Sequence, residues 1–374
     1  MTKPLDKTVP GLSRRRFVAG TGLAAAATSV SAPAIAQAMP ELKWRMPMFV
    51  PKTVESVVPA ANDFAKRVAE LSDGRFQIQP FGAGEIVPGG PAVMNAAEEG
   101  TVECAFTLSY YSFGKDAAYA FASTLPFGFT LRGQYAWLLR GGGLELCNEF
   151  FNARGTHCFP VGNSTAQMGG FFRREVNTLA DLKGLKMRIP GLGGMVMAKL
   201  GVIPQQIAPG EIYPALERGT IDAAEWAAPY DDFKFGFHRV AQFYYGPGWW
   251  EPQATILVAV NKKKWDELPK TYKAMIETAA LATCTTHNAW NDVLNSGGLR
   301  QIIAAGAKLR YFSQEIMDAS YEAAFKTFDE LKEKSPDFAK IYPAWKKHMD
   351  EHELYYRVGD NTYENYIFAK RVKS

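Results

Sequence analysis

An arginine and a glutamate stand near the ends of two predicted strands, where their side chains could act on one ligand. Residues 185–189 alternate apolar and basic side chains, a pattern typical of a half-buried strand, and Arg188 lies near its end. Residues 221–226 form a second predicted strand that carries Glu225. Ligands of open α/β sheets bind outside the carboxyl ends of strands, so we expect both side chains to share one cleft. A guanidinium there could hold a ligand carboxylate in its fork, or it could pair with Glu225 or Asp222.

A second glutamate could join the same cleft. Glu225 and Glu251 would repel each other, which raises the pKa of a carboxyl group unless a cation lies between them. Gln167 and the backbone carbonyl of Trp226 could add the oxygen ligands that Na⁺ and Ca²⁺ prefer. The alternative is that the glutamates pair with basic residues on the surface, for which the candidates are Arg173, Arg174 and Lys262. The residues alone leave the ion site and this alternative open.

Aromatic residues supply a third group of candidates. Tyr110 and Tyr111 follow a predicted strand, and Trp249 and Trp250 stand in the segment YYGPGWWEP. Aromatic side chains in sheet proteins are usually core, and we expect at least one of the tryptophans to be so. A phenol hydroxyl at a strand end can donate to a carboxylate or keto oxygen while its ring excludes water, and Tyr111 is the stronger candidate by position.

The elements that must position these residues begin with alternating strands and helices. The predicted order is strand 42–50, helix 54–71, strand 76–80, helix 91–99 and strand 102–108. This succession predicts right-handed crossovers and a largely parallel sheet, and therefore an α/β fold.

One junction occurs twice. Residues 96–103 (AAEEGTVE) match residues 215–222 (ALERGTID), and each is a helix end, a capping glycine and the start of a strand. Helix–glycine–strand junctions are alike in general, so the match alone does not establish a repeat. If the same α/β unit is used twice, the strands that follow should end in the cleft from opposite sides, at Tyr110–Tyr111 and at Glu225–Trp226.

Length predicts two lobes, because about 335 residues beyond the export signal exceed what one core usually organises. We assign residues 37–162 and 252–295 to lobe 1 and residues 163–251 and 296–335 to lobe 2. Further helices are expected at 135–154, broken at Gly141–Gly143, at 265–300, interrupted at Gly297–Gly298, and at 314–333. Residues 336–374 should add C-terminal helices that pack on the lobes or on a partner subunit, which makes a homodimer a candidate assembly.

Residues 1–36 have the pattern of an export signal. Ser13–Arg14–Arg15–Arg16–Phe17 is a twin-arginine pattern, followed by a mildly apolar run and by small residues at 34–36. We predict export to the periplasm by the twin-arginine route. Of the 42 basic and 38 acidic residues of the chain, five and one fall in this segment, which leaves 37 of each. A neutral chain has no broad electrostatic reason to bind nucleic acid or an anionic membrane.

Sequence motifs for catalysis are missing. The chain contains no P-loop, GxSxG or HExxH motif, and the glycines of IPGLGG lack the spacing of a dinucleotide site. The four cysteines show no CxxC or metal spacing, and we expect buried free thiols, with a Cys147–Cys158 disulfide as the alternative. The enzymatic hypothesis is a hydrolase that uses Glu225 and Glu251 as a carboxylate pair with no ion between them.

Three runs of sequence together resemble one protein family. They are DLKGLKMRIPG at 181–191, PQQIAPGEIYPALERGTIDAAEWAAPYDD at 204–232 and YYGPGWWEPQAT at 244–255. In this order they resemble the solute-binding proteins of tripartite ATP-independent periplasmic (TRAP) transporters, and in particular the branch that binds α-keto acids together with a metal ion. The resemblance covers roughly residues 42–345.

The resemblance implies a two-lobed periplasmic binding protein that is not an enzyme and that closes by hinge bending. It would bind a small 2-oxo or 2-hydroxy monocarboxylate and deliver it to the membrane subunits of a TRAP transporter. The implied substrate-binding residues are Tyr110, Tyr111, Gln167, Arg188 and Trp226, with Arg188 as the carboxylate clamp. The implied cation, Na⁺ or alternatively Ca²⁺, would be held by Gln167, Glu225, Trp226 and Glu251. Pro190, where glycine is expected, and Pro252 depart from the family pattern and leave the substrate's size open.

Overall fold

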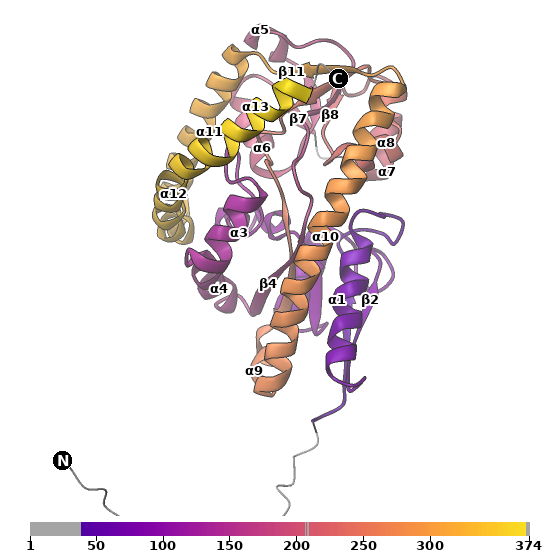
Figure 1. The fold of residues 1–374 in the computed structure, drawn as a ribbon, viewed down its shortest axis with the longest axis vertical. Helices are drawn as coiled ribbons and strands as arrows, with labels where there is room; N and C mark the ends of the chain where they lie inside the picture. The colour runs from indigo at the N-terminus through magenta and orange to yellow at the C-terminus, as the bar shows by residue number, and fades with distance from the viewer. Residues whose placement is uncertain (1–38, 206, 208, 372–374) are drawn as a thin grey trace, which may run out of the picture. The chain divides into compact units, whose positions relative to one another are not determined.

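The computed structural model describes residues 39–205, 207 and 209–371, and the export signal expected at 1–36 lies outside them. The described chain is α/β, as predicted, and its strands form sheets of two, three and six strands (Figure 1). The strands are β1 (Leu42–Pro47), β2 (Phe76–Phe81), β3 (Cys104–Thr107), β4 (Thr156–Asn163), β5 (Gly170–Phe172), β6 (Lys186–Arg188), β7 (Ile203–Gln205), β8 (Ala223–Ala224), β9 (Phe243–Gly246), β10 (Thr255–Asn261) and β11 (Lys308–Tyr311). The helices are α1 (Val58–Leu71), α2 (Pro91–Glu99), α3 (Leu131–Arg140), α4 (Gly143–Asn152), α5 (Leu179–Leu182), α6 (Gly191–Lys199), α7 (Pro209–Glu217), α8 (Pro229–Lys234), α9 (Lys262–Glu267), α10 (Lys270–Ala304), α11 (Gln314–Lys334), α12 (Pro336–Tyr356) and α13 (Thr362–Arg371).

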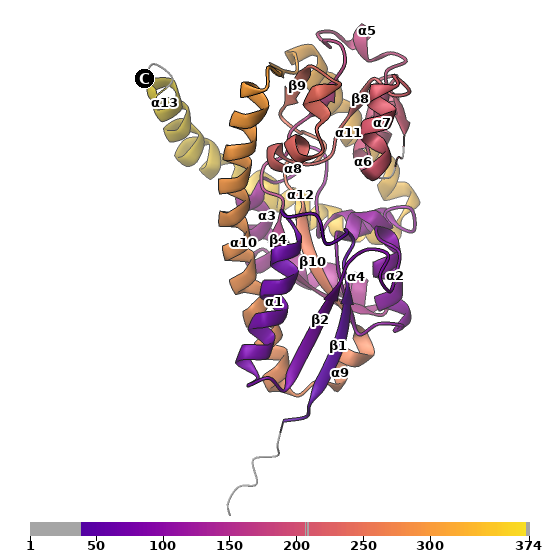
Figure 2. The same ribbon diagram turned by 90° about the vertical axis from the view of Figure 1, so that its right-hand side faces the viewer.

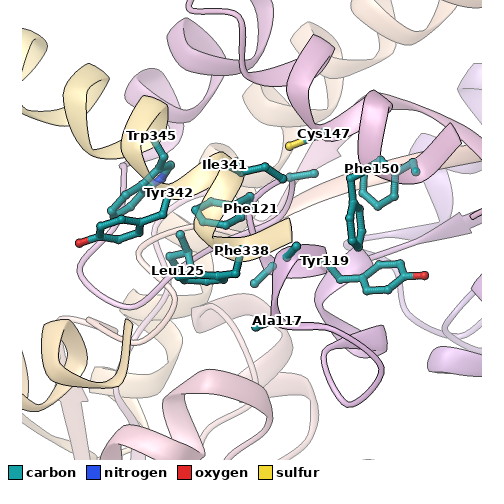
Figure 3. Close-up of a cluster of buried hydrophobic side chains, with 14 of the residues drawn as sticks. Ala117, Tyr119, Phe121, Leu125, Cys147, Phe150, Phe338, Ile341, Tyr342 and Trp345 are labelled. Atoms are coloured by element: carbon teal, nitrogen blue, oxygen red, sulfur yellow. The ribbon is translucent and has the colours of Figure 1, made fainter. Parts of the chain in front are cut away.

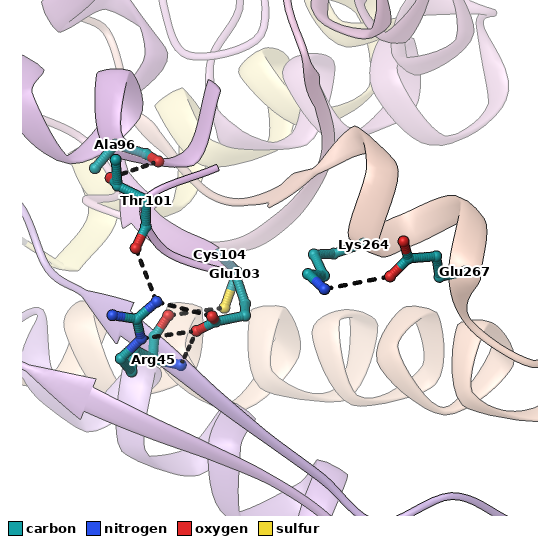
Figure 4. Close-up of polar contacts among 7 residues, drawn as sticks. All are labelled: Arg45, Ala96, Thr101, Glu103, Cys104, Lys264 and Glu267. Carbon is teal, nitrogen blue, oxygen red and sulfur yellow. Dashed lines mark hydrogen bonds and ion pairs between the residues drawn. The ribbon is translucent and has the colours of Figure 1, made fainter. Parts of the chain in front are cut away.

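The chain opens with the predicted β-α-β-α-β succession. Strands β1 and β2 pair in parallel over their whole length, and a parallel bridge from Met48 to Phe106 connects the end of β1 to β3. Arg45 on β1 donates to the carboxylate of Glu103 and to the carbonyl of Thr101, both at 2.8 Å (Figure 4). These contacts fasten β1 beside the start of β3.

The three-stranded sheet departs from the expected parallel arrangement. Its order is β3-β10-β4, and β10 runs antiparallel to both neighbours. Strand β10 enters the sheet about 150 residues after β3 in the chain, so local periodicity gave no indication of this pairing. The prediction of a largely parallel sheet is therefore wrong for this part of the fold.

The six-stranded sheet has the order β11-β9-β5-β8-β6-β7 and mixes parallel with antiparallel pairs. Strand β5 follows β4 in the chain and thereby carries the chain from one group of strands to the other. The two groups of strands are the cores of the two lobes of this α/β fold. The residue limits predicted for the lobes stay a prediction.

Helix α10 is a long helix that packs against β4 of the three-stranded sheet and against helix α8 (Figures 1 and 2). It is continuous through Gly297–Gly298, so the predicted interruption there is wrong. A Cβ placed on Gly298 would lie 2.6 Å from the backbone of Tyr230 in α8. The glycine therefore allows α8 and α10 to approach closely, which sequence periodicity could not distinguish from a helix break.

Several predicted limits near the candidate residues shift. Helix α5 begins with a capping box between Thr178 and Asp181 and ends at Leu182, and residues 183–184 form a turn before β6. Helix α6 begins at Gly191, and the strand expected at 221–226 shortens to the two residues of β8. Glu225 therefore lies immediately after a strand, not within one.

Helix α12 packs on its own chain. Phe338, Ile341, Tyr342 and Trp345 join a buried cluster with Phe121 and Leu125 (Figure 3). Helix α13 differs, because none of its residues is buried and Tyr363, Tyr366 and Phe368 are 65%, 61% and 58% exposed. The predicted C-terminal helices are thus confirmed, with α12 inside the fold and the apolar side chains of α13 outside it.

All four cysteines are buried free thiols, as expected, and the Cys147–Cys158 disulfide does not form. Within residues 39–205, 207 and 209–371, no helix combines the length and apolar character needed to cross a bilayer.

Candidate functional site

Five charged residues are buried in the part of the chain that the structure describes, apart from histidines. They are Arg188, Glu225, Asp231, Asp232 and Glu251. Each of these charges influences another of the group electrostatically. One guanidinium therefore stands among four carboxyl groups. Burying this excess of negative charge costs free energy unless protons or a cation neutralise it.

Arg188 and Glu225 meet at the ends of neighbouring parallel strands. The register of β6 and β8 pairs Arg188 with Ala224, which places Glu225 next to the guanidinium. Arg188 Nη1 lies 3.1 Å from Glu225 Oε2 and also donates to the Glu225 backbone carbonyl. The expected meeting of these side chains is confirmed, and the salt bridge weighed as an alternative forms with Glu225. Asp222 instead accepts a hydrogen bond from the backbone N–H of Lys186.

Part of the Arg188 guanidinium has no hydrogen-bond partner among the described residues. Among the described residues, no hydrogen bond engages Nε or Nη2 of Arg188. Its Cζ lies 5.2 Å from the centre of the Trp226 ring, which shields one face of the planar group. The free edge of the fork has the geometry that a carboxylate requires.

Gln167 and Glu251 form the second part of the site. Gln167 Nε2 donates to Glu251 Oε2 and to Ser164 Oγ, each at 3.1 Å, and these bonds fix the orientation of the amide. Gln167 Oε1 and Glu225 Oε1 are buried without a hydrogen-bond partner among the described residues. Unpaired buried oxygen atoms are costly, and a hard cation would satisfy both.

The two glutamates titrate in the direction expected for buried carboxyl groups. Burial raises the pKa of Glu225, and the Arg188 charge offsets part of this rise. Burial raises the pKa of Glu251 well above its ordinary value, and the Glu225 charge raises it further. The surface pairs with Arg173, Arg174 or Lys262 that were the alternative do not form, since Lys262 pairs with Asp266 and both glutamates are buried.

The donor set suits a hard cation more than a transition metal. In the described portion of the chain, no group of three or more His, Cys, Asp or Glu residues could hold a metal ion. A site here would combine two carboxylates with the neutral oxygens of an amide and a carbonyl. Oxygen sets of this kind bind Ca²⁺ and related hard cations.

Tyr110 and Tyr111 lie in a 3₁₀ turn, Ser109–Ser112, directly after β3 instead of at the end of a longer strand. Their ring centres are 4.8 Å apart. Burial raises the pKa of Tyr111 to about 12 and that of Tyr110 well above its ordinary value, so both hydroxyls are neutral donors. Trp249 and Trp250 are core residues, 3% and 1% exposed, and they line neither of the two cavities that both tyrosines line, although Trp250 lines a small third cavity with Tyr110 and Glu251.

Two cavities that share lining residues lie beside Arg188 and the tyrosines, and Glu225 and Glu251 line neither of them. An inner cavity of about 60 Å³ is lined by Tyr110, Tyr111, Gln167, Arg188 and Trp226, which are the five predicted substrate-binding residues. An outer cavity of about 760 Å³ shares four of these five and opens past Pro190 and Gly191. A cavity needs at least about 10–15 Å³ to hold one water-sized group, so the inner cavity has room for a small molecule.

The strands after the repeated junctions both deliver residues to this cavity. Gly100 and Gly219 have left-handed φ angles of 75° and 71°, as capping glycines should. The turn after β3 contributes the tyrosines and the residues after β8 contribute Trp226. Pro190, a departure from the expected pattern, lines only the outer cavity, so it affects the entrance and not the inner wall.

Sequence reasoning missed one acidic residue of the inner cavity. Asp231 lines it and accepts a hydrogen bond from Ser56 Oγ at 2.6 Å. Burial raises the pKa of Asp231 to about 6 and that of neighbouring Asp232 to about 8. Acidic residues are common in the first turn of an exposed helix, so the PYDD sequence gave no sign that this helix start is buried.

Comparison with known proteins places this geometry in context. Residues 50–335 match the family model described as bacterial extracellular solute-binding protein, family 7. A monocarboxylate 2-oxoacid-binding periplasmic protein of Nostoc sp. is 45% identical over 365 residues, which are 96% of this chain and 100% of that protein.

Two solved structures of TRAP solute-binding proteins are similar over most of the chain. The protein of Bordetella bronchiseptica RB50, a mixed-occupancy dimer with copurified calcium and picolinate, is 46% identical with a TM-score of 0.86 over 89% of this chain and 99% of that one. The protein of Pseudoalteromonas atlantica T6c, with bound sodium and pyruvate, is 34% identical with a TM-score of 0.80 over 87% and 99%.

Proposed function

Since this chain belongs to the bacterial extracellular solute-binding proteins of family 7, we propose that its inner cavity binds a small 2-oxo or 2-hydroxy monocarboxylate together with a cation. The family consists of transport receptors and not of enzymes, so the carboxylate-pair hydrolase considered for Glu225 and Glu251 is not supported. The protein is a receptor of TRAP type, and its ligand would pass to the membrane subunits of the transporter.

One observation carries the proposal. Arg188 is the only buried lysine or arginine among the described residues, and it lines a cavity that has room for a small molecule, with part of its fork free. The ligand carboxylate would take the free edge of this fork. Tyr110 and Tyr111 would donate hydrogen bonds to the carboxylate or the 2-oxo group, while the Trp226 ring excludes water.

The cation would neutralise the excess of carboxyl groups. Gln167 Oε1, the carboxylates of Glu225 and Glu251, and the Trp226 carbonyl are the proposed ligands, and the 2-oxo acid would complete the coordination. Such a cation supplies an electrostatic partner for the ligand carboxylate and the 2-oxo oxygen. Pyruvate with sodium and picolinate with calcium in the two similar structures support a cation bound beside the ligand, with Na⁺ or Ca²⁺ as candidates.

We also propose export to the periplasm by the twin-arginine route and assembly into a homodimer. The twin-arginine pattern at residues 13–17 supports the first. The exposed aromatic side chains of α13 support the second, because an apolar face of this kind is usually covered by a partner. The dimer of the Bordetella bronchiseptica protein is consistent with it.

A ligand-binding experiment on stripped protein tests the function. The chain from residue 37 onward would be unfolded, dialysed to remove copurified ligand, refolded and titrated with pyruvate in Na⁺, in Ca²⁺ and in a buffer of large organic cations with chelator. We expect a melting temperature that rises with pyruvate only when a metal cation is present, since ligand binding stabilises the native state by mass action. No response to any short 2-oxo or 2-hydroxy acid would refute the proposal.

A further inference from the structure

A second group of polar side chains lines the inner cavity besides those of the proposed ion and carboxylate site. These residues come from the segment before α1, from the crossing between the lobes, from α8 and from α10. They are Ser56, Ser164, Asp231, Asn291 and Asn295. The hydrogen bonds that each one already makes determine what it can still offer a ligand.

Three of these residues are occupied. Ser164 Oγ accepts from Gln167 Nε2 and from the backbone N–H of Ala254, and donates to the Thr165 carbonyl. The Asn295 amide donates to Thr165 Oγ1 and accepts from the backbone N–H of Tyr230. The Ser56 hydroxyl donates a hydrogen bond to Asp231 Oδ2.

The two remaining residues offer acceptors. Asn291 is 2% exposed, and its Nδ2 donates to the Asn163 carbonyl at 2.8 Å, which fixes the amide and leaves Oδ1 buried without a partner in the described chain. Asp231 presents a carboxylate whose Oδ2 accepts from Ser56, and the Trp226 side chain also donates to this carboxylate. A ligand group at this wall would therefore meet a negative charge and an unpaired carbonyl-type oxygen.

Positive charge is missing from this wall. Arg188 is the one buried lysine or arginine in the described residues and is already paired with Glu225. Burial lowers the pKa of His287, which contacts Ser56 and Asn291. Glu55 raises the pKa of Asp231 electrostatically and Asp231 raises that of Asp232, so both of these charged neighbours are acidic. Lys234 on the same helix pairs with Glu55 at 3.4 Å and its side chain is 55% exposed.

We propose that Asp231, together with the free Oδ1 of Asn291, restricts this site to monocarboxylates by rejecting any ligand that brings a second carboxylate into the inner cavity. The inference rests on the proposed function, because it assumes that Arg188 holds the first carboxylate. The site has one guanidinium for one carboxylate, and a second carboxylate would lie against Asp231 with no counter-charge. Asp231 is thus a residue that determines specificity and not part of the clamp.

Two ligands matched in size and shape distinguish the effect of a second negative charge on affinity from the effect of ligand size. 2-Oxoglutarate ends in a carboxylate, and 5-methyl-2-oxohexanoate carries an uncharged isopropyl group in its place. Both would be titrated by calorimetry at pH 7 in the presence of the cation, against wild-type protein and Asp231→Asn. Pyruvate would serve as the common reference ligand.

We expect the wild type to bind the uncharged analogue at least about tenfold more tightly than 2-oxoglutarate, and Asp231→Asn to reduce this ratio at least about tenfold. Asp232→Asn is the matched control, because Asp232 lies on the same helix, is 1% exposed, accepts from Tyr244 OH and does not line the cavity. Its ratio should stay that of the wild type.

Three outcomes would overturn the inference while pyruvate still binds. The ratio could be unchanged in Asp231→Asn, it could fall equally in Asp232→Asn, or the wild type could reject both long ligands equally, which would mean selection by size. Failure of the wild type to bind pyruvate under any ionic condition would instead refute the proposed function itself.

Discussion

Arg188 Nη1 lies 3.1 Å from Glu225 Oε2, while Nε and Nη2 of the same guanidinium have no hydrogen-bond partner among the described residues. The Glu225 carboxylate thus holds the arginine in place, while its Nε and Nη2 groups can still donate to the carboxylate of a ligand. The paired edge fixes its orientation, and the free edge gives a ligand carboxylate a prepared binding position.

Replacement of the arginine tests this arrangement directly. Arg188→Ala should weaken pyruvate binding at least about 30-fold, because one partner of a buried charge pair is lost. Arg188→Lys keeps the charge but loses the fork, and it should also bind poorly. Arg174→Ala, which removes a surface guanidinium bonded to the Asp181 carbonyl, is the control. Wild-type affinity in Arg188→Ala, measured by calorimetry, would exclude the clamp.

Glu225→Gln should separate cation binding from folding. The amide resembles the protonated carboxyl group that burial favours, so the variant should fold, but it removes a negative charge from the proposed ion site. We expect a loss of cation affinity of at least about tenfold, seen as a shifted midpoint when Ca²⁺ or Na⁺ is titrated in the presence of pyruvate. Glu217→Gln, on the exposed face of α7, should leave the midpoint unchanged. Equal midpoints in both variants would argue against Glu225 as a ligand.

The stability of the ligand-free protein should depend on pH in an unusual direction. Burial raises the pKa of Asp232 from its ordinary 3.8 to about 8, so protonation favours the folded state. Its contribution to stability is complete below about pH 4 and is lost as the pH rises through 8. The melting temperature in chelator should therefore fall by a few degrees between pH 6 and pH 9, and Asp232→Asn should flatten this slope. Parallel curves for the variant and the wild type would show that another group is responsible.

Two adjacent glycines of α10 should respond in opposite ways to the same substitution. Gly298→Ala places a methyl group 2.6 Å from the backbone of Tyr230 and should cost about 1–3 kcal/mol of unfolding free energy. Gly297→Ala meets nothing within 4 Å and should gain about 0.5–1 kcal/mol, because alanine has the higher helix propensity. Urea unfolding of both variants measures the difference. Similar values for the two would mean that α8 can move away from α10.

Assembly through α13 can be tested on its exposed aromatic residues. Light scattering should give a dimer for the wild type and a monomer for the double variant Tyr366→Ser and Phe368→Ser, with pyruvate binding retained. Tyr311→Ser is a suitable control, since this residue is 73% exposed but lies on β11. A dimer that persists in the double variant would locate the interface elsewhere.

Much of the fold and site could be predicted from local patterns. Helix α2 and its glycine cap and strand β2 follow from periodicity and from turn residues, because those signals act within a few residues. The convergence of Arg188 and Glu225 followed from a topological rule for parallel strands. The resemblance to a family supplied Gln167 and Glu251, for which spacing alone gave no reason.

What could not be predicted depends on distant parts of the chain. The antiparallel insertion of β10 between β3 and β4 joins segments about 150 residues apart, and nothing in either segment encodes the partner. Gly298 was interpreted as a break because its reason is the backbone of Tyr230 in another helix. Asp231 looked like an exposed acid at a helix start, and only the packing of α8 near Ser56 shows that it is buried.

The four buried carboxyl groups have a consequence for the protons that the receptor takes up and releases when it binds its ligand. Burial and the Glu225 charge raise the pKa of Glu251 well above its ordinary value in the empty site. A carboxyl group binds a metal cation in its deprotonated form, so any proton that Glu251 holds in the empty site would leave when the cation binds. Capture of substrate would then acidify the medium, and the calorimetric enthalpy would change with the ionisation enthalpy of the buffer. The receptor would be an exchanger of protons for metal ions, loading more readily in alkaline than in acidic surroundings.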